Sequence, residues 1–339
     1  RTTRLDAKHN GRKLEADALK IVINRIYGAL NDAMDYLYDP ECTYTVTINL
    51  QLLLCNLIES FELNGFDVLS ANTDGLLIRR PNDRLDLFNH ICKEWEDYSK
   101  LSLDTEVFEK YCRSAVNDYI AVGYGFYDAL QEYNRCGVWI DSKGNTYTTR
   151  QAIEDKFIKF KGYFLQDPEY NKGFVYPVVK KALKEYFLYG VDITEFIRNY
   201  INTSRTAIYD YCFSQKVAGK YTTIYKTVRD GKPVYIKCQK HNRFYICKNG
   251  GGAITKAIVP DSDNIAYGDD ISGIVVEEEK SLVADQRVAL FNDYEYKEDY
   301  NLNYGFYINE AYKILYGNGK TGKGERRGIN NNSNNLFGW

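Results

Sequence analysis

The sequence has 339 residues, which predicts about two domains, and it is 44% hydrophobic and 27% charged, as expected for a globular protein with a substantial core. No segment contains the roughly 20 uninterrupted apolar residues that a membrane-spanning helix requires, and no signal-peptide pattern is found. The eight cysteines include no Cys-x-x-Cys pair, and the three histidines are dispersed. These patterns argue against a disulfide framework and a zinc site, and they favour a cytoplasmic protein with reduced thiols.

The net charge of −2 conceals two blocks of opposite sign. Residues 214–257 contain ten lysines and arginines and a single acid, Asp230, whereas residues 258–300 contain twelve acids and three basic residues. Such opposed blocks predict a face that binds an anionic ligand. A solvated surface loop is the alternative.

The spacing of apolar residues, with Gly, Asn and Pro at the ends of the periodic segments, predicts the regular elements. In chain order they are helices over 13–38 and 46–63, strands over 67–71 and 76–80, a helix over 84–101, two strands within 102–123, a strand over 156–165, a helix over 177–190, strands over 222–227, 233–238 and 243–247, and a helix over 304–316. The turn at Asn10-Gly11 follows an earlier helix, and residues 317–339 are expected to form a flexible tail. This order predicts an α+β fold with an antiparallel sheet and packed helices.

Four residues in the first long helix are spaced K-x-x-x-N-x-x-Y-G, so that Lys20, Asn24, Tyr27 and Gly28 lie on one helical face. A cation, an amide, an aromatic ring and a glycine that permits close approach form a surface able to hold a triphosphate and to stack a base. An amphipathic helix with incidental polar residues is the alternative.

Arg4 and Lys8 are four residues apart, hence on one face of the preceding helix, and a turn separates them from Lys20. Two antiparallel helices could therefore direct three cations at one phosphate chain. Solvated surface charges are the alternative.

The tetrad Asn72-Thr73-Asp74-Gly75 lies between two apolar strands. Asp74 is therefore expected at the exposed tip of a hairpin, where a carboxylate can bind a divalent cation that prefers oxygen ligands. An ordinary Asp-Gly turn is the alternative.

Taken together and in this order, these motifs resemble those of family B DNA polymerases, particularly the viral and phage branch. KIVINRIYG is similar to the fingers motif K-x-x-x-N-S-x-Y-G, with Arg25 where serine is usual, and ANTDG is similar to the palm motif D-T-D-S, with Asp74 at its second, metal-binding aspartate. NDYIAV resembles the segment that holds the primer strand, with Tyr119 kept, and KFKGYF resembles the K-x-K-G stretch that leads into the thumb. CQKHNRFYICKNGGG and YGFYINEAYKIL resemble C-terminal segments of the family, so the resemblance extends from residue 1 to about residue 316.

The resemblance implies a helical fingers hairpin in residues 1–38, an antiparallel palm sheet with packed helices in 39–190, and a mixed α/β thumb and C-terminal region in 191–316. It also implies template-directed DNA synthesis, in which two Mg²⁺ ions, for which Mn²⁺ could substitute, promote the attack of a primer 3′-hydroxyl on a dNTP.

The resemblance further implies roles for individual residues. Asp74, with Asn72 beside it, would bind metal, and Asp74 and Lys20 would be the catalytic residues. The residues implied to bind the incoming dNTP are Arg4, Lys8, Lys20, Asn24, Tyr27 and Gly28. The residues expected to bind primer–template DNA are Tyr119, Lys159, Lys161, Gly162, Lys237, Lys240, Arg243 and Lys256, of which the last four belong to the basic block.

Three departures from the family pattern set the remaining expectations. Asn72 replaces an aspartate, Asn117 replaces a lysine in the primer segment, and the sequence lacks the first palm motif, with its essential aspartate, and the exonuclease acids. Because the chain starts at Arg1 rather than Met, we expect these to lie upstream in the same gene product or in a companion chain. A non-catalytic DNA-binding chain of a split or decayed polymerase is the alternative.

Overall fold

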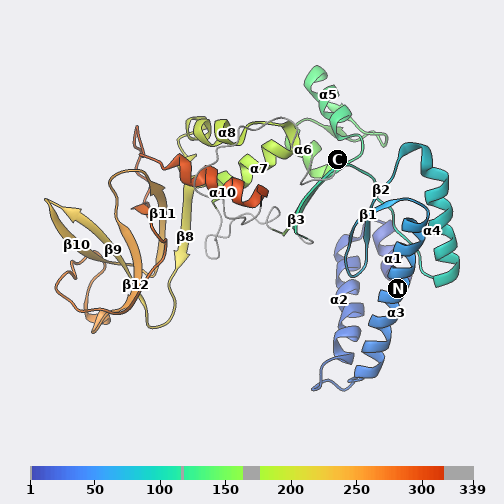
Figure 1. Ribbon diagram of the computed structural model, residues 1–339, viewed down its shortest axis with the longest axis horizontal. Helices are drawn as coiled ribbons and strands as arrows, with labels where there is room; N and C mark the ends of the chain where they lie inside the picture. Colours follow the sequence, from blue (N-terminus) through green and yellow to red (C-terminus); the bar gives the residue numbers. More distant parts are fainter. Residues whose placement is uncertain (1, 116–117, 163–175, 317–339) are drawn as a thin grey trace. The chain divides into compact units, whose positions relative to one another are not determined.

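A computed structural model describes residues 2–115, 118–162 and 176–316 (Figure 1). The chain divides into two compact units, Arg1–Thr105 and Glu106–Trp339, called unit 1 and unit 2 below. The fold is α+β, as expected, and the paired strands among the described residues are antiparallel. The boundary between the units falls inside the segment expected to be the palm, and the division into fingers, palm and thumb stays a prediction.

Unit 1 combines helices with one β-hairpin (Figure 1). Its elements are α1 (Thr2–His9), α2 (Lys13–Leu30), α3 (Pro40–Leu63), β1 (Asp67–Ala71), β2 (Leu76–Arg79), a 3-10 turn (Asn82–Arg84) and α4 (Leu85–Ser99). Strands β1 and β2 pair from Asp67 opposite Arg79 to Ala71 opposite Leu76, so the tetrad 72–75 forms the connection between them. The hairpin predicted from the sequence is therefore confirmed.

The core of unit 1 lies between α3, α4 and one face of the hairpin. Its buried members are Leu57, Phe61, Phe66, Ile91 and Trp95. The rings of Phe61, Phe66 and Phe88 pack against one another, and the Trp95 indole N–H donates to the carbonyl of Leu53 at 2.8 Å. This small cluster holds the hairpin against the two helices.

The helix expected over 13–38 ends at Leu30, and the next helix begins at Pro40 rather than at residue 46. The Asp32 carboxylate accepts the N–H of Met34, so this local turn competes with helix continuation. Asp39 then caps α3 by accepting the N–H of Cys42, and Pro40 occupies its first turn, where a missing N–H costs nothing.

Unit 2 contains the remaining described strands and helices (Figure 1). They are β3 (Phe108–Ala115), β4 (Asp118–Gly123), α5 (Phe126–Cys136), β5 (Trp139–Ile140), β6 (Thr146–Tyr147), α6 (Arg150–Phe157), β7 (Ile158–Lys161), α7 (Pro177–Tyr189), α8 (Ile193–Asn199), a 3-10 turn (Tyr200–Thr203), α9 (Ile208–Tyr211), β8 (Cys212–Lys216), β9 (Thr222–Arg229), β10 (Lys232–Cys238), β11 (His241–Cys247), β12 (Ala253–Ile258), a 3-10 turn (Ser262–Asn264), β13 (Glu277–Ser281), β14 (Arg287–Leu290) and α10 (Tyr304–Tyr316).

Three larger sheets organise unit 2. Their strand orders are β3-β4-β7, β14-β11-β8 and β10-β9-β12-β13. One extended core cluster includes Ile120 and Val122 of β4, Leu183 of α7, Phe244 of β11 and Tyr307 of α10. The Tyr307 hydroxyl donates to the carbonyl of Tyr211 at 2.8 Å and accepts the N–H of Ile246 at 2.9 Å, which satisfies this buried polar group.

Several elements of unit 2 agree with the sequence-based predictions, including α7 from Pro177 and α10 over 304–316. The strand predicted over 156–165 is shorter than expected, because α6 continues to Phe157 and β7 spans Ile158–Lys161. Residues 163–165 of that prediction, Asn117 and the predicted tail lie outside the described residues.

Candidate functional site

The motif residues of α2 lie on an exposed surface of unit 1. Lys20, Asn24, Tyr27 and Gly28 are all exposed, and their spacing places them on one helical face. A Cβ atom added at Gly28 would meet nothing within 4 Å, so neighbouring atoms do not require glycine there. The space beside this face is open to a ligand.

Tyr27 also connects α2 to α3. Its hydroxyl lies 2.7 Å from Oγ1 of Thr47, and the Thr47 hydroxyl lies 2.8 Å from the carbonyl of Thr43. Since a threonine hydroxyl has one proton, which Thr47 donates to Thr43, Tyr27 is the donor to Thr47. This bond fixes the hydroxyl end of the Tyr27 side chain, while the residue stays 45% exposed.

Arg4 and Lys8 are both on α1, which contacts α2 after the turn at residues 10–12. Arg4 is partly buried, and its Nε atom is buried without a hydrogen-bond partner. Lys8 is placed on the helix by its backbone, and its side chain lies outside the described atoms. The structure therefore brings the helices of all three predicted cations together, without describing a shared binding geometry.

Asp74 is exposed in the connection between β1 and β2. The Asn72 amide oxygen accepts the Asp74 N–H at 3.1 Å, and the Asn72 N–H donates to the carbonyl of Gly75 at 3.0 Å. A carbonyl oxygen has two lone pairs, so Asn72 could still ligate a cation beside Asp74. The donor set of one carboxylate and one amide oxygen fits Mg²⁺ chemically and leaves most of its coordination shell to other groups.

Asp67 lies at the opposite end of the same hairpin. It is opposite Arg79 in register, and its carboxylate lies 3.4 Å from the Arg79 guanidinium. Because β1 is extended over five residues, Asp67 is separated from the tip by the length of the strand. It does not share a site with Asp74.

Two segments of unit 2 that were expected to bind DNA meet on one sheet. Tyr119 of β4 is directly opposite Lys161 of β7, and Ala121 is opposite Lys159. Residues directly opposite in an antiparallel pair project to the same face, so Tyr119, Lys159 and Lys161 share a face. The Lys161 ammonium lies 5.9 Å from the Tyr119 ring centroid, and Lys159 forms an ion pair with Glu106.

The third strand of this sheet adds residues that the sequence-based prediction did not include. Arg113 of β3 is opposite Tyr119, and the Tyr111 ring stacks on the Tyr119 ring with centroids 4.9 Å apart. Burial raises the pKa of Tyr111 to about 12, so its hydroxyl is a neutral donor at ordinary pH. The alternation of Tyr111 and Arg113 with the buried Cys112 was a signal in the sequence that could have identified them.

The two faces of this sheet differ in character. Cys112, Ile120, Val122 and Ile158 pack into the main core of unit 2. The opposite face carries the tyrosines and cations, here called the Tyr119 face and defined by Tyr111, Arg113, Tyr119, Lys159 and Lys161. Gly162 directly follows β7 and has a positive φ of 63°, a backbone conformation that favours glycine.

The four residues of the basic block 214–257 that were expected to bind DNA differ in their surroundings. Lys240 is exposed, the Arg243 guanidinium lies 4.9 Å from the Tyr209 ring centroid, and the Lys256 ammonium lies 5.1 Å from that of Tyr221. Lys237 is only 5% exposed, and its ammonium donates to the backbone carbonyls of Ser262 and Ile265. The ammonium of Lys237 is thus hydrogen-bonded inside the protein. We therefore do not include Lys237 among the cations proposed to bind DNA.

The acidic block partly neutralises the basic one. Strand β13, Glu277–Ser281, pairs with β12 at the edge of the four-stranded sheet. Glu278 and Glu279 form ion pairs with Lys220 at 2.9 Å and Lys226 at 2.6 Å. Blocks that are opposed along the sequence are therefore neighbours in space.

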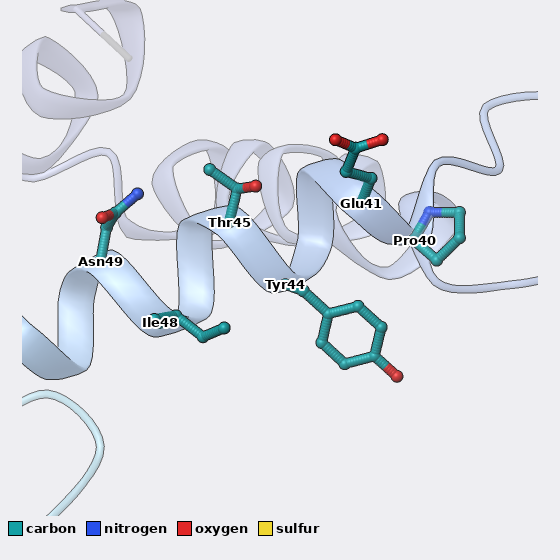
Figure 2. A pocket seen from close by; sticks show the side chains of 6 residues that line it. All are labelled: Pro40, Glu41, Tyr44, Thr45, Ile48 and Asn49. Atoms are coloured by element: carbon teal, nitrogen blue, oxygen red, sulfur yellow. The ribbon is translucent and has the colours of Figure 1, made fainter.

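A shallow depression lies along the first turns of α3 (Figure 2). Its lining residues are Pro40, Glu41, Tyr44, Thr45, Ile48 and Asn49, and its volume is about 550 Å³. All of these residues belong to one helix, and the side chains of Glu41 and Tyr44 point away from each other in Figure 2. Because no reactive groups converge there, we assign it no role.

By length and composition alone, α3 is one candidate membrane-spanning helix among the described residues, although its sequence has no uninterrupted apolar run of that length. It contains Glu59 and Glu62, and it contributes Leu57 and Phe61 to the core of unit 1. Core helices of globular proteins meet the same criterion but are mostly buried, whereas only 11% of the apolar window of α3 is buried. A single helix of this kind is weak evidence for a membrane span.

Comparison of the sequence with models of known protein families and with curated proteins gives no match. The resemblance to family B DNA polymerases therefore depends on the motifs and their order.

Proposed function

We propose that this chain is the C-terminal fingers, palm and thumb portion of a cytoplasmic family B DNA polymerase, which extends a primer 3′-hydroxyl with dNTPs on a DNA template. One observation carries the proposal. Tyr119 and Lys161, which belong to two separate segments that resemble DNA-binding motifs of the family, are register partners on neighbouring strands. A row of cation and aromatic side chains suits a phosphodiester backbone, because charge binds phosphate without reading sequence.

The residues of unit 1 would handle the nucleotide. Lys20, supported by Arg4 and Lys8, would neutralise the triphosphate, and Asn24 would donate its amide. The exposed Tyr27 ring would lie against the nascent base pair, with Gly28 leaving room for it. These roles require exposed residues, and Lys20, Asn24, Tyr27 and Gly28 are all exposed.

Asp74, with Asn72 beside it, would hold a divalent cation at the hairpin tip. When bound, Mg²⁺ or Mn²⁺ supplies Lewis-acid activation of the primer hydroxyl and stabilises the leaving pyrophosphate. The protein contributes the position of the carboxylate, which the turn fixes through the hydrogen bond from the Asp74 N–H to Asn72. A second carboxylate would come from the upstream part of the polymerase or from a companion chain.

The second candidate is a non-catalytic DNA-binding chain of a split or decayed polymerase. The observation that favours it is the tip itself, which presents the neutral Asn72 beside Asp74, with the Asn72 amide oxygen already accepting a hydrogen bond. Both candidates use the Tyr119 face to bind DNA, and they differ in whether Asp74 is catalytic.

Primer extension by the complete polymerase, including the polypeptide that supplies the second carboxylate, separates the two candidates. Asp74→Asn should abolish Mg²⁺-dependent incorporation and leave DNA affinity nearly unchanged. Asp67→Asn is the matched control, because it removes the same charge from the other end of the same hairpin. Near-normal synthesis by the Asp74→Asn enzyme would reject the catalytic assignment and favour the DNA-binding alternative.

A further inference from the structure

Three lysines and a tyrosine gather at the β13 edge of the four-stranded sheet in unit 2. Lys256 of β12 is directly opposite Lys280 of β13, and Lys220 and Tyr221 immediately precede β9, the strand that pairs with the other side of β12. The Tyr221 ring centroid lies 5.1 Å from the Lys256 ammonium and 5.7 Å from that of Lys220. We call these four residues the Tyr221 cluster.

The carboxylate of Glu278 is hydrogen-bonded to two members of the Tyr221 cluster, and the neighbouring Glu277 adds a second negative charge near Lys220. One of the Glu278 carboxylate oxygens accepts from the Lys220 ammonium at 2.9 Å, and the other accepts from the Tyr221 hydroxyl at 2.6 Å. Hydrogen bonds from Tyr221 and Lys220 lower the pKa of Glu278, so this acid is ionised at ordinary pH. The cluster thus already binds one anionic group with two oxygens.

Two features of the Tyr221 cluster with Glu278 bound are energetically unfavourable. Lysines directly opposite on neighbouring strands repel each other, and Lys256 and Lys280 are such a pair. Glu278 has a positive φ of 48°, at a position where the register of β12 and β13 shifts between Lys256 and Ile258. L-residues rarely adopt this backbone conformation, so the turn that presents Glu278 to the cluster is itself strained.

Exposure makes exchange with a ligand feasible. The Lys220 and Glu278 side chains are 59% and 46% exposed, so an incoming anion can reach the ammonium without opening the core. The neighbouring pair of Glu279 with Lys226 is different, because those side chains are 30% and 25% exposed and the Lys226 ammonium lies over Tyr235. Exchange is therefore expected at Glu278 and not at Glu279.

We infer that the Tyr221 cluster is a binding site for a backbone phosphate of DNA, and that Glu278 is an internal competitor that occupies this site in the absence of DNA. The inference rests on the proposed function for its choice of DNA as ligand. A phosphate has acceptor oxygens for Lys220 and Tyr221, as the carboxylate does, and its charge would also offset the repulsion between Lys256 and Lys280.

Equilibrium binding of the full chain to a fluorescent DNA duplex, measured over a range of salt concentrations, tests the inference. Glu278→Gln removes the competing charge, and we expect a three- to tenfold gain in DNA affinity at low salt. The slope of log Kobs against log salt should steepen by about 0.9, the value for one additional phosphate contact. Glu298→Gln is the charge-matched control, since Glu298 is an exposed acid of the same unit outside the described ion pairs. Equal gains in the two variants would overturn the inference.

Two further arms assign the gain to this cluster and to DNA. Lys280→Gln added to Glu278→Gln should cancel the gain, and persistence of the gain would overturn the assignment to this cluster. Inorganic tripolyphosphate should gain no affinity comparable with that of DNA, and an equal gain would show a site for free polyphosphate instead. Thermal unfolding of each variant checks that the fold is kept. Because no arm measures synthesis, failure of primer extension would reject the polymerase proposal and leave this binding result intact.

Discussion

Units 1 and 2 differ in how much apolar surface they bury. In unit 2, one cluster extends from the β3-β4-β7 sheet through α7 to α10, whereas the main cluster of unit 1 has five buried members. Among the described residues, most of the exposed large hydrophobic side chains belong to unit 1, the shorter unit, including Ile21 at 70% and Met34 at 93%. Unit 1 therefore has less hydrophobic stabilisation relative to its size.

The difference separates two kinds of proposed binding surface. Four of the residues proposed to bind the dNTP lie on α2, and among the described residues of this helix only Ala16 and Ala29 are buried. The Tyr119 face instead lies on a sheet whose other face is part of the main core. Since local stability follows local packing, we expect the nucleotide surface to be the more adjustable and the DNA surface the more rigid.

The largest expected effect comes from removing one phenylalanine from each core. Phe61 is 1% exposed in unit 1, and Phe126 is fully buried in unit 2. Phe→Ala in a core costs about 3–5 kcal/mol at either position. We expect Phe61→Ala to unfold unit 1, because so few other buried side chains remain, and Phe126→Ala to weaken unit 2 while leaving it folded.

Hydrogen exchange of peptides from α3 and α7 reports the two units separately. Loss of protection in α3 of the Phe61→Ala protein, with α7 unchanged, is the expected result. Retained protection in α3 would show that unit 1 has stability beyond the core described above, and would remove the contrast between the units.

A smaller loss of unfolding free energy is expected when the buried ion network around Glu154 in unit 2 is altered. Glu154 is 3% exposed, and it accepts hydrogen bonds from Lys184, from Arg150 at 2.9 Å and from Tyr189 at 2.5 Å. Burial alone would raise the pKa of Glu154, but these bonds, led by those from Lys184 and Tyr189, lower it from 4.5. Glu154→Gln should cost about 1.5–3 kcal/mol at pH 7, the range for hydrogen bonds to charged groups.

The sign of the pH dependence follows from the lowered pKa. In the unfolded chain the pKa of Glu154 is 4.5, and the stabilisation by ionised Glu154 is fully present above this pH. It is lost as the pH falls through the lower pKa of the folded state. Urea unfolding of wild type and Glu154→Gln should therefore converge in that acidic range. Asp97→Asn in unit 1 is the control, since its pair with Lys93 is exposed and worth about 0–1 kcal/mol. A constant difference at all pH values would show that the charge of Glu154 is not the cause.

Local signals in the sequence predicted the parts of the fold that local chemistry determines. The hairpin of β1 and β2 follows from turn residues between apolar strands, and α7 follows from Pro177 at its start. The true end of α2 and start of α3 were missed, although Asp39-Pro40 is a local signal for a helix start.

The candidate site shows the same division between local and distant determinants. The exposed face of α2 and the hairpin tip could be predicted, because each lies within one short segment. The meeting of Tyr119 with Lys161 depends on strand register between distant segments, and only the family resemblance placed both near DNA. The burial of Lys237 depends on carbonyls more than 20 residues away, which residue charge alone does not reveal.

The smallest expected effect concerns Tyr27, where stability and proposed function can be separated. Tyr27→Phe removes the hydrogen bond to Thr47 that joins α2 to α3, and keeps the ring. Because the site is exposed, the loss should be about 0.5–1 kcal/mol in the unfolding free energy of unit 1. Thr47→Val breaks the same bond from the other side, so the double variant should cost less than the sum of the two single variants. Strict additivity would show that the bond does not contribute.

In the complete polymerase, Tyr27→Phe should retain dNTP incorporation and Tyr27→Ala should lose much of it, because the proposed contact with the base pair uses the ring and not the hydroxyl. Equal incorporation by the Phe and Ala variants would leave Tyr27 a residue that joins two helices, and would remove it from the proposed nucleotide surface.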